Sequence, residues 1–368
     1  MTAPNLDQIR ERLAQVTHPA FDKPMAELGL IDDVRLANGE LALRATIHAA
    51  SETLKHEIAA RIERALADLD LESVEIEWDL QVPMRPTGGD DPVAGVKNVV
   101  LVMSGKGGVG KSTVAVNLAL ALARAGTRVG LLDADIYGPS IPTMLGVSGN
   151  PHSKDGKTIE PLQRFGLKLM SIGFMIENDK DAIIWRGPML QGALMQFLGD
   201  VNWGELDYLV LDLPPGTGDV ALSLAQRLKS TGAVIVTTPQ EVALQDVYKS
   251  VSMCKKLHIP VLGVIENMSY FLDSAGVRHE IFGAGGGQKI AEYAQAPLLG
   301  QIPLHTQVRV CGDGGTPIVQ AAPTHPAAQA FAQAADMLAE HIALESFVRG
   351  GGKKAPDGKG QRKLKIVR

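Results

Sequence analysis

The sequence predicts an α/β protein in which a large doubly wound domain, with a mostly parallel sheet, follows a small N-terminal α+β domain. Two observations support this. From residue 98 onward, strand-length apolar runs alternate with helical segments, and a stretch rich in Pro, Gly and Asp separates this region from the mixed strands and helices before it. We therefore expect a small domain over 1–82, a linker over 83–97, the large domain over 98–348 and a flexible basic tail over 349–368.

The small domain shows the signals of two helices and three strands. Apolar residues recur at helical spacing from Leu6 to Val16, and "DDVRLANGELALRATIH" predicts two strands joined by a turn at Asn38-Gly39. Ser51 is positioned to cap a second helix, and "SVEIEWDL" alternates as a strand does. These elements together predict a compact α+β unit.

Continuous apolar runs in the large domain are typical of parallel strands that helices cover on both faces. The strand candidates are "NVVLVM", "RVGLLDAD", "LDYLVLDLP", "AVIVTTP" and "PVLGVIENM". The helical segments are "STVAVNLALALARAG", "VALSLAQRLKSTG", "ALQDVYKSVSMCKKLHIP" and a long C-terminal one, "THPAAQAFAQAADMLAEHIAL". This alternation predicts the doubly wound arrangement.

Composition and charge narrow the functional class. A formal net charge of −5 gives no reason to expect nucleic-acid binding. No apolar run approaches the roughly 20 residues of a membrane span, and the polar first residues lack the apolar core of a secretory signal. The two cysteines, Cys254 and Cys311, are too few for a disulfide scaffold. We expect a cytoplasmic protein that binds neither nucleic acid nor membrane.

The segment "SGKGGVGKST", residues 104–113, predicts a phosphate-binding loop. It lies between a strand and a helix and matches G-x-x-x-x-G-K-[ST], the pattern of a P-loop NTPase. Its glycines let successive backbone N–H groups point at an anion, Lys111 can reach the β- and γ-phosphates, and the Ser112 hydroxyl can bind Mg²⁺. The residues expected to bind ATP here are Gly105, Lys106, Gly107, Gly108, Val109, Gly110, Lys111, Ser112 and Thr113.

Polar side chains follow three further strands of the predicted sheet. Asp133 and Asp135 end one strand, Asp212 ends another and Asn267 ends a third. Open α/β sheets bind ligands at the carboxyl ends of their strands, so we expect Asp212 to hold Mg²⁺ and Asn267 to hydrogen-bond adenine. The alternative is that these side chains only form turns or cap helices.

The sequence resembles a known group of ATPases. The form K-G-G-x-G-K-[ST], with Lys106 as its first lysine, is similar to the loop of MinD, ParA and the nitrogenase iron protein. Longer phrases between about Gly95 and Val319 resemble the Mrp/ApbC iron–sulfur cluster carrier ATPases, and residues 1–80 resemble the small domain often fused to bacterial members. The phrases are "GVKNVVLVMSGKGGVGKST", "LLDADIYGPSIPTMLG", "MSIGF", "IWRGPML", "WGELDYLVLDLPPGTGD", "VIVTTPQEVALQDV" and "GVIENMSYF".

The resemblance implies a homodimeric ATPase that carries a [4Fe–4S] cluster and passes it to apoproteins. It further implies that Lys106 reaches across the dimer to the partner's ATP, so that Lys106, Lys111 and Asp135 are catalytic. Asp135 would orient or activate the attacking water, while Asp133 would join Ser112 and Asp212 around Mg²⁺. Hydrolysis would then be slow outside the dimer.

The thiolates that the resemblance implies are absent. Family members hold the cluster with a C-x-x-C pair just after "ENMSYF", but residues 272–283 here contain no cysteine, and neither does "AASETLKHEI" in the small domain. Cys254 lies in an apolar helix face and Cys311 in a loop nearer the expected nucleotide. No cluster ligand is therefore assigned.

Three functions stay open. The chain is an ATP-dependent cluster carrier or assembly factor with apo iron–sulfur proteins or assembly factors as clients, using an unusual cluster site or a partner that holds the cluster. Alternatively, it is a dimerising ATPase switch that remodels or loads a protein client and has lost the cluster site. A MinD-type positioning ATPase is disfavoured, because the C-terminal tail has too few apolar residues for a membrane-binding helix.

Overall fold

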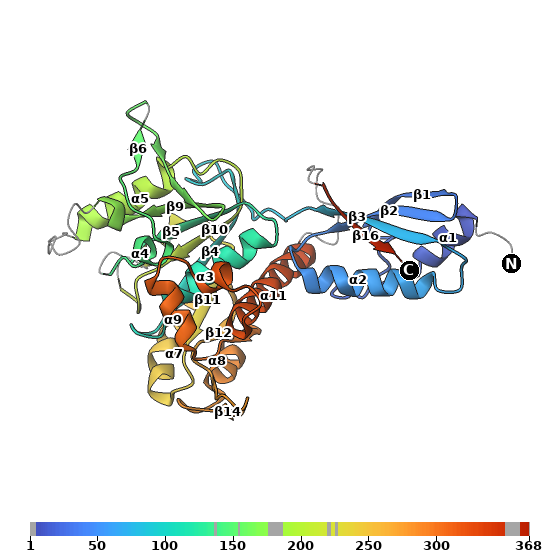
Figure 1. Cartoon of the computed structure of the whole chain (residues 1–368). Coiled ribbons are helices and arrows are strands. Elements are labelled where there is room, and N and C mark those ends of the chain that lie inside the picture. The colour runs from blue at the N-terminus through green and yellow to red at the C-terminus, as the bar shows by residue number, and fades with distance from the viewer. Residues whose placement is uncertain are drawn as a thin grey trace. The chain divides into compact units, whose positions relative to one another are not determined.

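The computed structural model describes residues 5–135, 138–153, 155–175, 187–218, 222–224, 227–349 and 361–367. The chain divides into two compact units, one formed by Met1–Pro83 with Ala339–Arg368 and the other by Met84–Leu338 (Figure 1). Each unit has a sheet of its own. No helix of the described residues is long and apolar enough to cross a membrane.

The first unit contains the helices and strands that the sequence predicts. Asn38 and Gly39 both have positive φ, +51° and +79°, as the tight turn between β1 and β2 requires. The Ser51 hydroxyl accepts a hydrogen bond from the backbone N–H of Leu54 and so caps α2. The elements are α1 (Leu6–Leu13), β1 (Ile31–Ala37), β2 (Glu40–Ile47), α2 (Glu52–Ala65), β3 (Ser73–Leu80) and β16 (Gln361–Val367).

The tail differs from the expectation of a flexible segment over 349–368. Residues 361–367 form β16, which pairs antiparallel with β3 and completes the strand order β1-β2-β3-β16. The reason is that β3 pairs with β2 on one side and would otherwise leave its other edge unpaired, and "LKIV" has strand-forming residues. Residues 350–360 lie outside the described part of the chain.

His18 is a buried titratable side chain of the first unit. It is 3% exposed, stacks on Phe21 with ring centroids 4.1 Å apart, and accepts a hydrogen bond at Nδ1 from the Ala20 backbone N–H. Burial lowers the pKa of His18 to about 4, and the charges of His48 and Arg61 act in the same direction. The folded unit therefore holds His18 uncharged.

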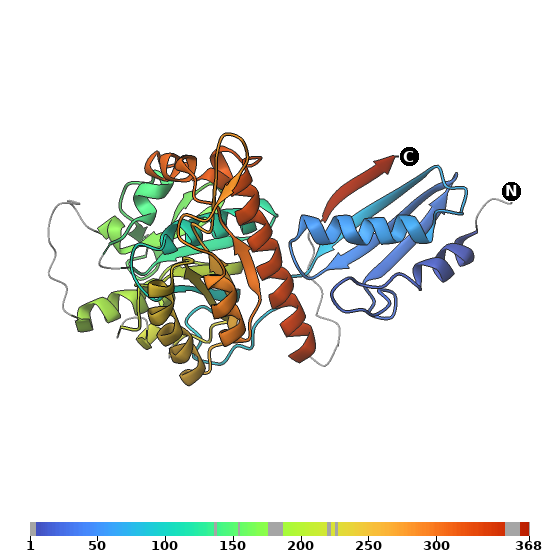
Figure 2. The same cartoon turned by 90° about the horizontal axis from the view of Figure 1, so that it is seen from below.

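The second unit is a doubly wound α/β structure, as predicted. Eight of its described strands form one sheet in the order β15-β12-β11-β4-β10-β5-β9-β8, in which β8 and β9 alone pair antiparallel, while β6–β7 and β13–β14 form two separate two-stranded sheets. Every residue of β5, β10 and β11 is buried, because helices cover both faces of the sheet (Figures 1 and 2).

The elements of the second unit follow in chain order, and the last helix continues past Leu338 into the residues that belong to the first unit. They are β4 (Val96–Ser104), α3 (Lys111–Arg124), β5 (Val129–Asp133), α4 (Ile141–Leu145), β6 (His152–Ser153), β7 (Ile159–Glu160), β8 (Leu162–Arg164), β9 (Leu167–Ser171), the 3₁₀ helix η1 (Ile172–Met175), α5 (Gly187–Gly199), β10 (Leu206–Asp212), β11 (Gly232–Thr237), α7 (Glu241–Lys256), β12 (Val261–Glu266), β13 (Phe271–Leu272), β14 (Arg278–His279), α8 (Gly286–Ala294), β15 (Leu298–Gln301), α9 (Thr306–Asp313), α10 (Ile318–Ala321) and α11 (Pro326–Arg349). The helix predicted over residues 220–232 lies partly outside the described residues.

The segment expected to be a linker, 83–97, is in part built into the second unit. Arg85 forms a buried ion pair with Asp91 and donates to the carbonyl of Val93, and its backbone N–H bonds to Lys97. The carboxylate and the carbonyl accept hydrogen bonds from both Nη atoms of the buried guanidinium. Pro and Gly residues of 83–97 therefore belong to turns of the folded unit rather than to a flexible linker.

Candidate nucleotide-binding site

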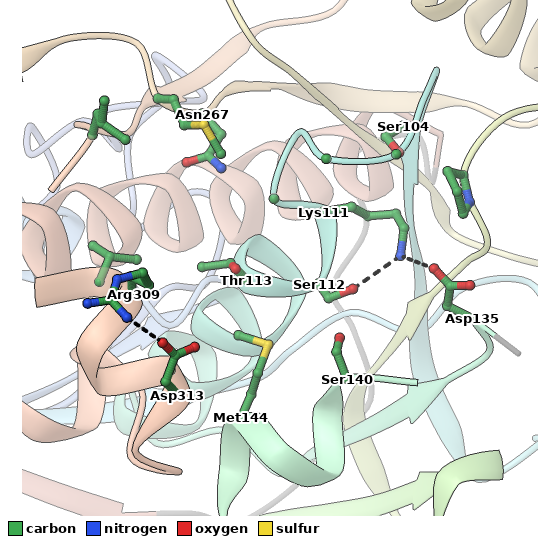
Figure 3. A pocket seen from close by; sticks show the side chains of 18 of the residues that line it. Ser104, Lys111, Ser112, Thr113, Asp135, Ser140, Met144, Asn267, Arg309 and Asp313 are labelled. Atoms are coloured by element: carbon green, nitrogen blue, oxygen red, sulfur yellow. Dashed lines mark hydrogen bonds and ion pairs between the residues drawn. The ribbon is translucent and has the colours of Figure 1, made fainter. Parts of the chain in front are cut away.

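A cavity of about 730 Å³ opens at the carboxyl ends of the parallel strands of the second unit (Figure 3). One wall is the phosphate loop with the start of α3, and the opposite wall comes from α4, α9 and the segments after β12 and β15. The lining residues are Ser104, Lys106, Gly107, Gly108, Gly110, Lys111, Ser112, Thr113, Asp135, Pro139, Ser140, Thr143, Met144, Pro215, Asn267, Met268, Pro303, Leu304, His305, Val308, Arg309, Gly312 and Asp313.

The phosphate loop has the backbone shape that its glycines predict. Gly110 caps the N-terminus of α3 with a left-handed φ of +79°. A Cβ on Gly105 would lie 2.4 Å from the backbone nitrogen of Val247, so only glycine fits against α7 there. The loop thus ends at a helix N-terminus whose free N–H groups and dipole favour an anion.

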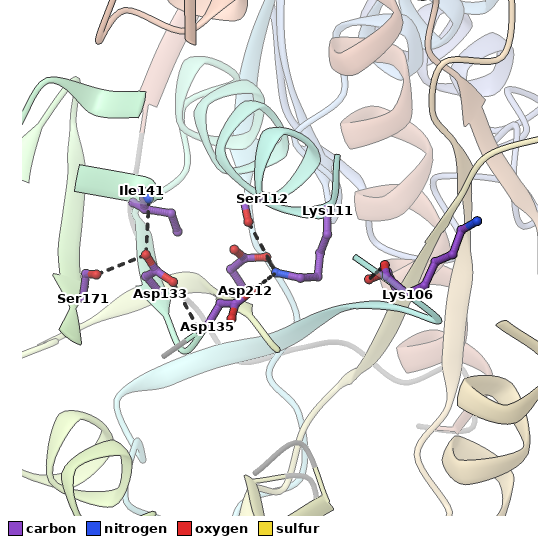
Figure 4. Close-up of polar contacts among 9 residues, drawn as sticks. Lys106, Lys111, Ser112, Asp133, Asp135, Ile141, Ser171 and Asp212 are labelled. Carbon is purple, nitrogen blue, oxygen red and sulfur yellow. Dashed lines mark hydrogen bonds and ion pairs between the residues drawn. The ribbon is translucent and has the colours of Figure 1, made fainter. Parts of the chain in front are cut away.

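Lys111 lies among the predicted carboxylates (Figure 4). Its Nζ is 2.6 Å from Asp212 Oδ1 and 3.5 Å from Asp135 Oδ2, and 3.4 Å from Ser112 Oγ. Both Lys111 and Asp212 are buried, at 6% and 0% side-chain exposure. The structure therefore brings together four of the residues that the sequence assigned to phosphate, metal and catalysis.

Asp212 keeps one carboxylate oxygen free. Its Oδ2 is buried and has no hydrogen-bond partner among the described residues. Burial raises the pKa of Asp212, although the ammonium of Lys111 opposes the shift. An unpartnered buried carboxylate oxygen beside a serine hydroxyl is a donor set that suits Mg²⁺, which takes one or two carboxylates together with phosphate oxygens.

Asp133, by contrast, already has partners for both oxygens (Figure 4). Oδ1 accepts the backbone N–H of Asp135 at 3.1 Å, while Oδ2 accepts the N–H of Ile141 at 3.2 Å and the hydroxyl of Ser171 at 3.1 Å. Burial, followed by the charge of Asp212 opposite it in the sheet, raises the pKa of Asp133. This carboxyl ties the segment after β5 to the start of α4 and the end of β9.

Lys106 and Asn267 have different surroundings from those of Lys111. The Lys106 side chain points away from Lys111 and from the carboxylates (Figure 4), and its backbone carbonyl accepts a hydrogen bond from the hydroxyl of Ser104. Asn267 lies at the cavity wall, where its Nδ2 donates to the carbonyl of Val109 at 2.8 Å. The amide of Asn267 therefore braces the phosphate loop.

Comparison with known proteins decides the family. A family model described as the NUBPL iron-transfer P-loop NTPase matches residues 95–339, and one described as an iron–sulfur cluster assembly protein matches residues 6–78. The chain belongs to the Mrp/ApbC iron–sulfur cluster carrier family of P-loop NTPases. The iron–sulfur cluster carrier protein of Synechocystis is 43% identical over 93% of this chain and 99% of its own length, and that of Escherichia coli K12 is 44% identical over 92% and 93%.

Solved structures agree with this membership. A nucleotide-binding protein from Archaeoglobus fulgidus, solved in complex with ADP, is 39% identical, with a TM-score of 0.55 over 65% of this chain and 93% of that chain. The cell division ATPase MinD of Pyrococcus furiosus matches 65% of this chain and 97% of its own with a TM-score of 0.50. At 23% identity this second likeness shows the shared fold alone.

The hairpin β13–β14 occupies the place where the resemblance to the carrier family implies a C-x-x-C pair. Asp273 closes it: Oδ1 accepts the backbone N–H groups of Ala275 and Val277, and Oδ2 lies 2.8 Å from Nε2 of His279. The His279 contact and the backbone N–H of Val277 lower the pKa of Asp273. A carboxylate thus organises this turn with protein groups alone.

The two thiols lie on α7 and α9. Cys254 is buried in α7 against Met103, and burial raises its pKa to about 11, so the thiolate that binds iron is disfavoured. Cys311 is 8% exposed on α9, with the Gln307 amide 3.4 Å from its sulfur. Among the described residues, no group of three or more His, Cys, Asp or Glu side chains is arranged to hold a metal ion.

Sequence reasoning missed the wall that faces the phosphate loop. Thr143 and Met144 come from α4, and the Arg309–Asp313 ion pair comes from α9 (Figure 3). No sequence pattern assigned these residues to the nucleotide site, because they meet the cavity only through tertiary packing. It also missed Glu266, which sits beside Asn267 and is fully buried.

Proposed function

We propose that the chain binds MgATP in this cavity and hydrolyses it, as a member of the cluster carrier family. The position of Lys111 carries the proposal, because it places a buried ammonium at the N-terminus of α3 within 3.5 Å of Asp135 and 2.6 Å of Asp212. Positive charge and backbone N–H groups that converge on one point stabilise the β- and γ-phosphates and the charge that develops in phosphoryl transfer.

Ser112 and Asp212 are the residues proposed to hold Mg²⁺. The support is the free, buried Oδ2 of Asp212 and the hydroxyl of Ser112 beside Lys111. When bound, Mg²⁺ supplies positive charge that stabilises the phosphoryl group in transfer. We assign Asp133 to another task, since its oxygens already serve Asp135, Ile141 and Ser171.

Asp135 is proposed to orient the attacking water. It lines the cavity and is 13% exposed, so it can meet water, and the contact with Lys111 keeps its carboxylate directed toward the phosphate end. The backbone N–H bond to Asp133 fixes where Asp135 leaves the strand. A carboxylate held in this way can accept a proton from water or align the water for in-line attack.

A second copy of the chain is proposed to complete the site through Lys106. The support is that Lys106 shares a loop with Lys111 but extends away from its own carboxylate cluster (Figure 4). A cation on the outer side of the loop can reach phosphates bound by a partner, as an arginine finger does. Hydrolysis would then depend on assembly.

For the cargo, we propose that the chain delivers iron–sulfur clusters to apoproteins while a partner supplies thiolates. Family membership supports the delivery, and Asp273 in the hairpin together with buried Cys254 argues against retention of a cluster by this chain alone. The same two observations favour a second candidate, a dimerising ATPase switch that loads or remodels a client and carries no cluster.

Two measurements test the proposal. Wild type should hydrolyse ATP with a Mg²⁺ requirement, whereas Lys111→Ala should lose nucleotide binding or turnover, and equal turnover in the two proteins would refute the assigned site. Anaerobic cluster reconstitution should leave wild type with no more bound iron and sulfide than a Cys254→Ser/Cys311→Ser variant. A cluster that only wild type holds would show direct carriage by these thiols.

A further inference from the structure

Glu266, at the end of β12, is a buried carboxylate that neither the sequence motifs nor the family match assigns to a task. It is 0% exposed, and no described lysine or arginine forms an ion pair with it. Instead, Oε1 accepts the Ser269 hydroxyl at 2.5 Å and the Gln301 amide at 2.9 Å, and Oε2 accepts the backbone N–H of Gly287 at 2.6 Å. Short hydrogen bonds to a carboxylate are stronger than hydrogen bonds between neutral groups.

These three partners belong to segments that meet at one wall of the nucleotide cavity. Ser269 follows Asn267 and Met268, which line the cavity, and Gln301 precedes Pro303, which also lines it. Gly287 belongs to α8, where a Cβ would lie 2.7 Å from that of Glu266, so glycine is needed for the approach. One carboxylate therefore joins both wall segments to a fixed helix.

The backbone at this wall is strained where Glu266 holds it. Met268 has a φ of +53°, in the left-handed region that non-glycine residues avoid. Such a conformation persists when surrounding contacts over-determine it. The Ser269 hydroxyl bond to Glu266 and the Ser269 N–H bond to the carbonyl of Ile302 fix the turn on one side, and the Asn267 N–H bond to Thr237 fixes it on the other.

We propose that Glu266 is a positioning residue that sets the wall formed by Asn267, Met268 and Pro303 for the nucleoside part of the bound nucleotide. This inference rests on the proposed ATP-binding function. It assigns Glu266 no contact with the nucleotide. It places the main effect of Glu266 at the nucleoside wall. Because Asn267 Nδ2 also donates to the carbonyl of Val109 in the phosphate loop, a change at Glu266 should weaken the nucleoside end more than the phosphate end.

Glu266→Gln and Glu266→Leu separate this task from simple packing. Glutamine can keep its carbonyl oxygen toward the Gly287 N–H, because the Ser269 hydroxyl can reverse its bond and the Gln301 amide can present its oxygen. Leucine removes both acceptor oxygens, and with them all three hydrogen bonds, at similar size. Ser269→Ala removes only the hydroxyl bond between Glu266 and the turn at Met268. Glu292→Gln, at an exposed carboxylate of α8, is the matched control.

Isothermal titration calorimetry of the full chain with ATP and with tripolyphosphate tests the proposal. Glu266→Leu should lose about tenfold in ATP affinity, equal to about 1.4 kcal/mol, while its tripolyphosphate affinity stays within about twofold of wild type. Glu266→Gln should bind ATP within about threefold of wild type. The ATP affinity of Ser269→Ala should lie between those of Glu266→Leu and Glu266→Gln, and Glu292→Gln should match wild type.

The outcomes distinguish a failure of the positioning role of Glu266 from a failure of the proposed ATP binding. Equal losses of ATP and tripolyphosphate affinity, or unchanged ATP affinity in Glu266→Leu, would overturn the positioning role. If Glu266→Leu does not fold, the Ser269→Ala comparison decides, and an ATP affinity equal to that of wild type there overturns the proposal. A wild-type chain that binds neither ligand would instead refute the proposed function itself.

Discussion

The ion pair between Lys111 and Asp212 should make a measurable contribution to the stability of the nucleotide-free protein. Lys111→Met removes the ammonium that lies 2.6 Å from a fully buried carboxylate and leaves that carboxylate without a charged partner. Removal of one member of a buried pair costs about 3–5 kcal/mol, and protonation of Asp212 limits the loss, so we expect about 3 kcal/mol at pH 7.5. Asp212→Asn in the same chain should restore about 2 kcal/mol, because it removes the buried carboxylate that Lys111→Met leaves unpaired.

The pH dependence of Lys111→Met has a definite sign. Burial already raises the pKa of Asp212, and loss of Lys111 raises it further. A group whose folded-state pKa is raised contributes stability below its unfolded pKa and loses it as pH rises through the folded pKa. The deficit of Lys111→Met should therefore grow from pH 5 to pH 8.

Hydrogen exchange of β4 and β10 across a urea series, without nucleotide, reports the second unit separately from the first. Lys111→Met is compared with the Lys111→Met/Asp212→Asn double variant at both ends of the pH range. A single variant as stable as wild type at pH 8, or a double variant that recovers nothing, would show that the electrostatic account of the site is wrong.

Two further predictions concern buried ionisable groups. Because the pKa of His18 falls to about 4 in the folded unit, its contribution to stability is lost as pH drops below 6.5, about 2 kcal/mol between pH 7 and 5. Hydrogen exchange in β2 and β3 should show this loss in wild type, and a His18→Asn chain that is equally acid-sensitive would contradict it. Asp133→Asn places a donating amide NH2 group against the backbone N–H of Asp135, which is also a donor. This loss of a hydrogen bond should lower kcat about tenfold without changing the Mg²⁺ requirement. A raised Mg²⁺ requirement would instead make Asp133 a metal ligand.

The phosphate loop and the strand-end residues were predictable because local sequence determines them. A strand, four glycines and a helix start are contiguous between Ser104 and Ser112, and the parallel sheet brings Asp133 opposite Asp212 by register. The turn at Asn38-Gly39 and the cap at Ser51 are local in the same sense. Wherever the physical cause lies within a few residues, the sequence and the structure agree.

The remaining features depend on contacts between distant segments. Nothing in the sequence around Asp133 indicates that Ile141 and Ser171 will use its second oxygen, and nothing around Glu266 indicates Gly287 or Gln301. The strand formed by residues 361–367 shows the same limit, because its partner β3 lies far away in the sequence. Polar residues that act as tertiary anchors carry no periodicity or motif of their own.

The central claim, that a second copy completes the ATPase site through Lys106, is tested most directly by mixing two inactive variants. Lys106→Ala keeps a complete cis site, and Asp135→Asn keeps Lys106. In an equal mixture about half of the dimers are mixed, each with one site that has both residues, so turnover should recover to about one quarter of wild type. Turnover in the mixture no higher than the mean of the separate variants would contradict the claim.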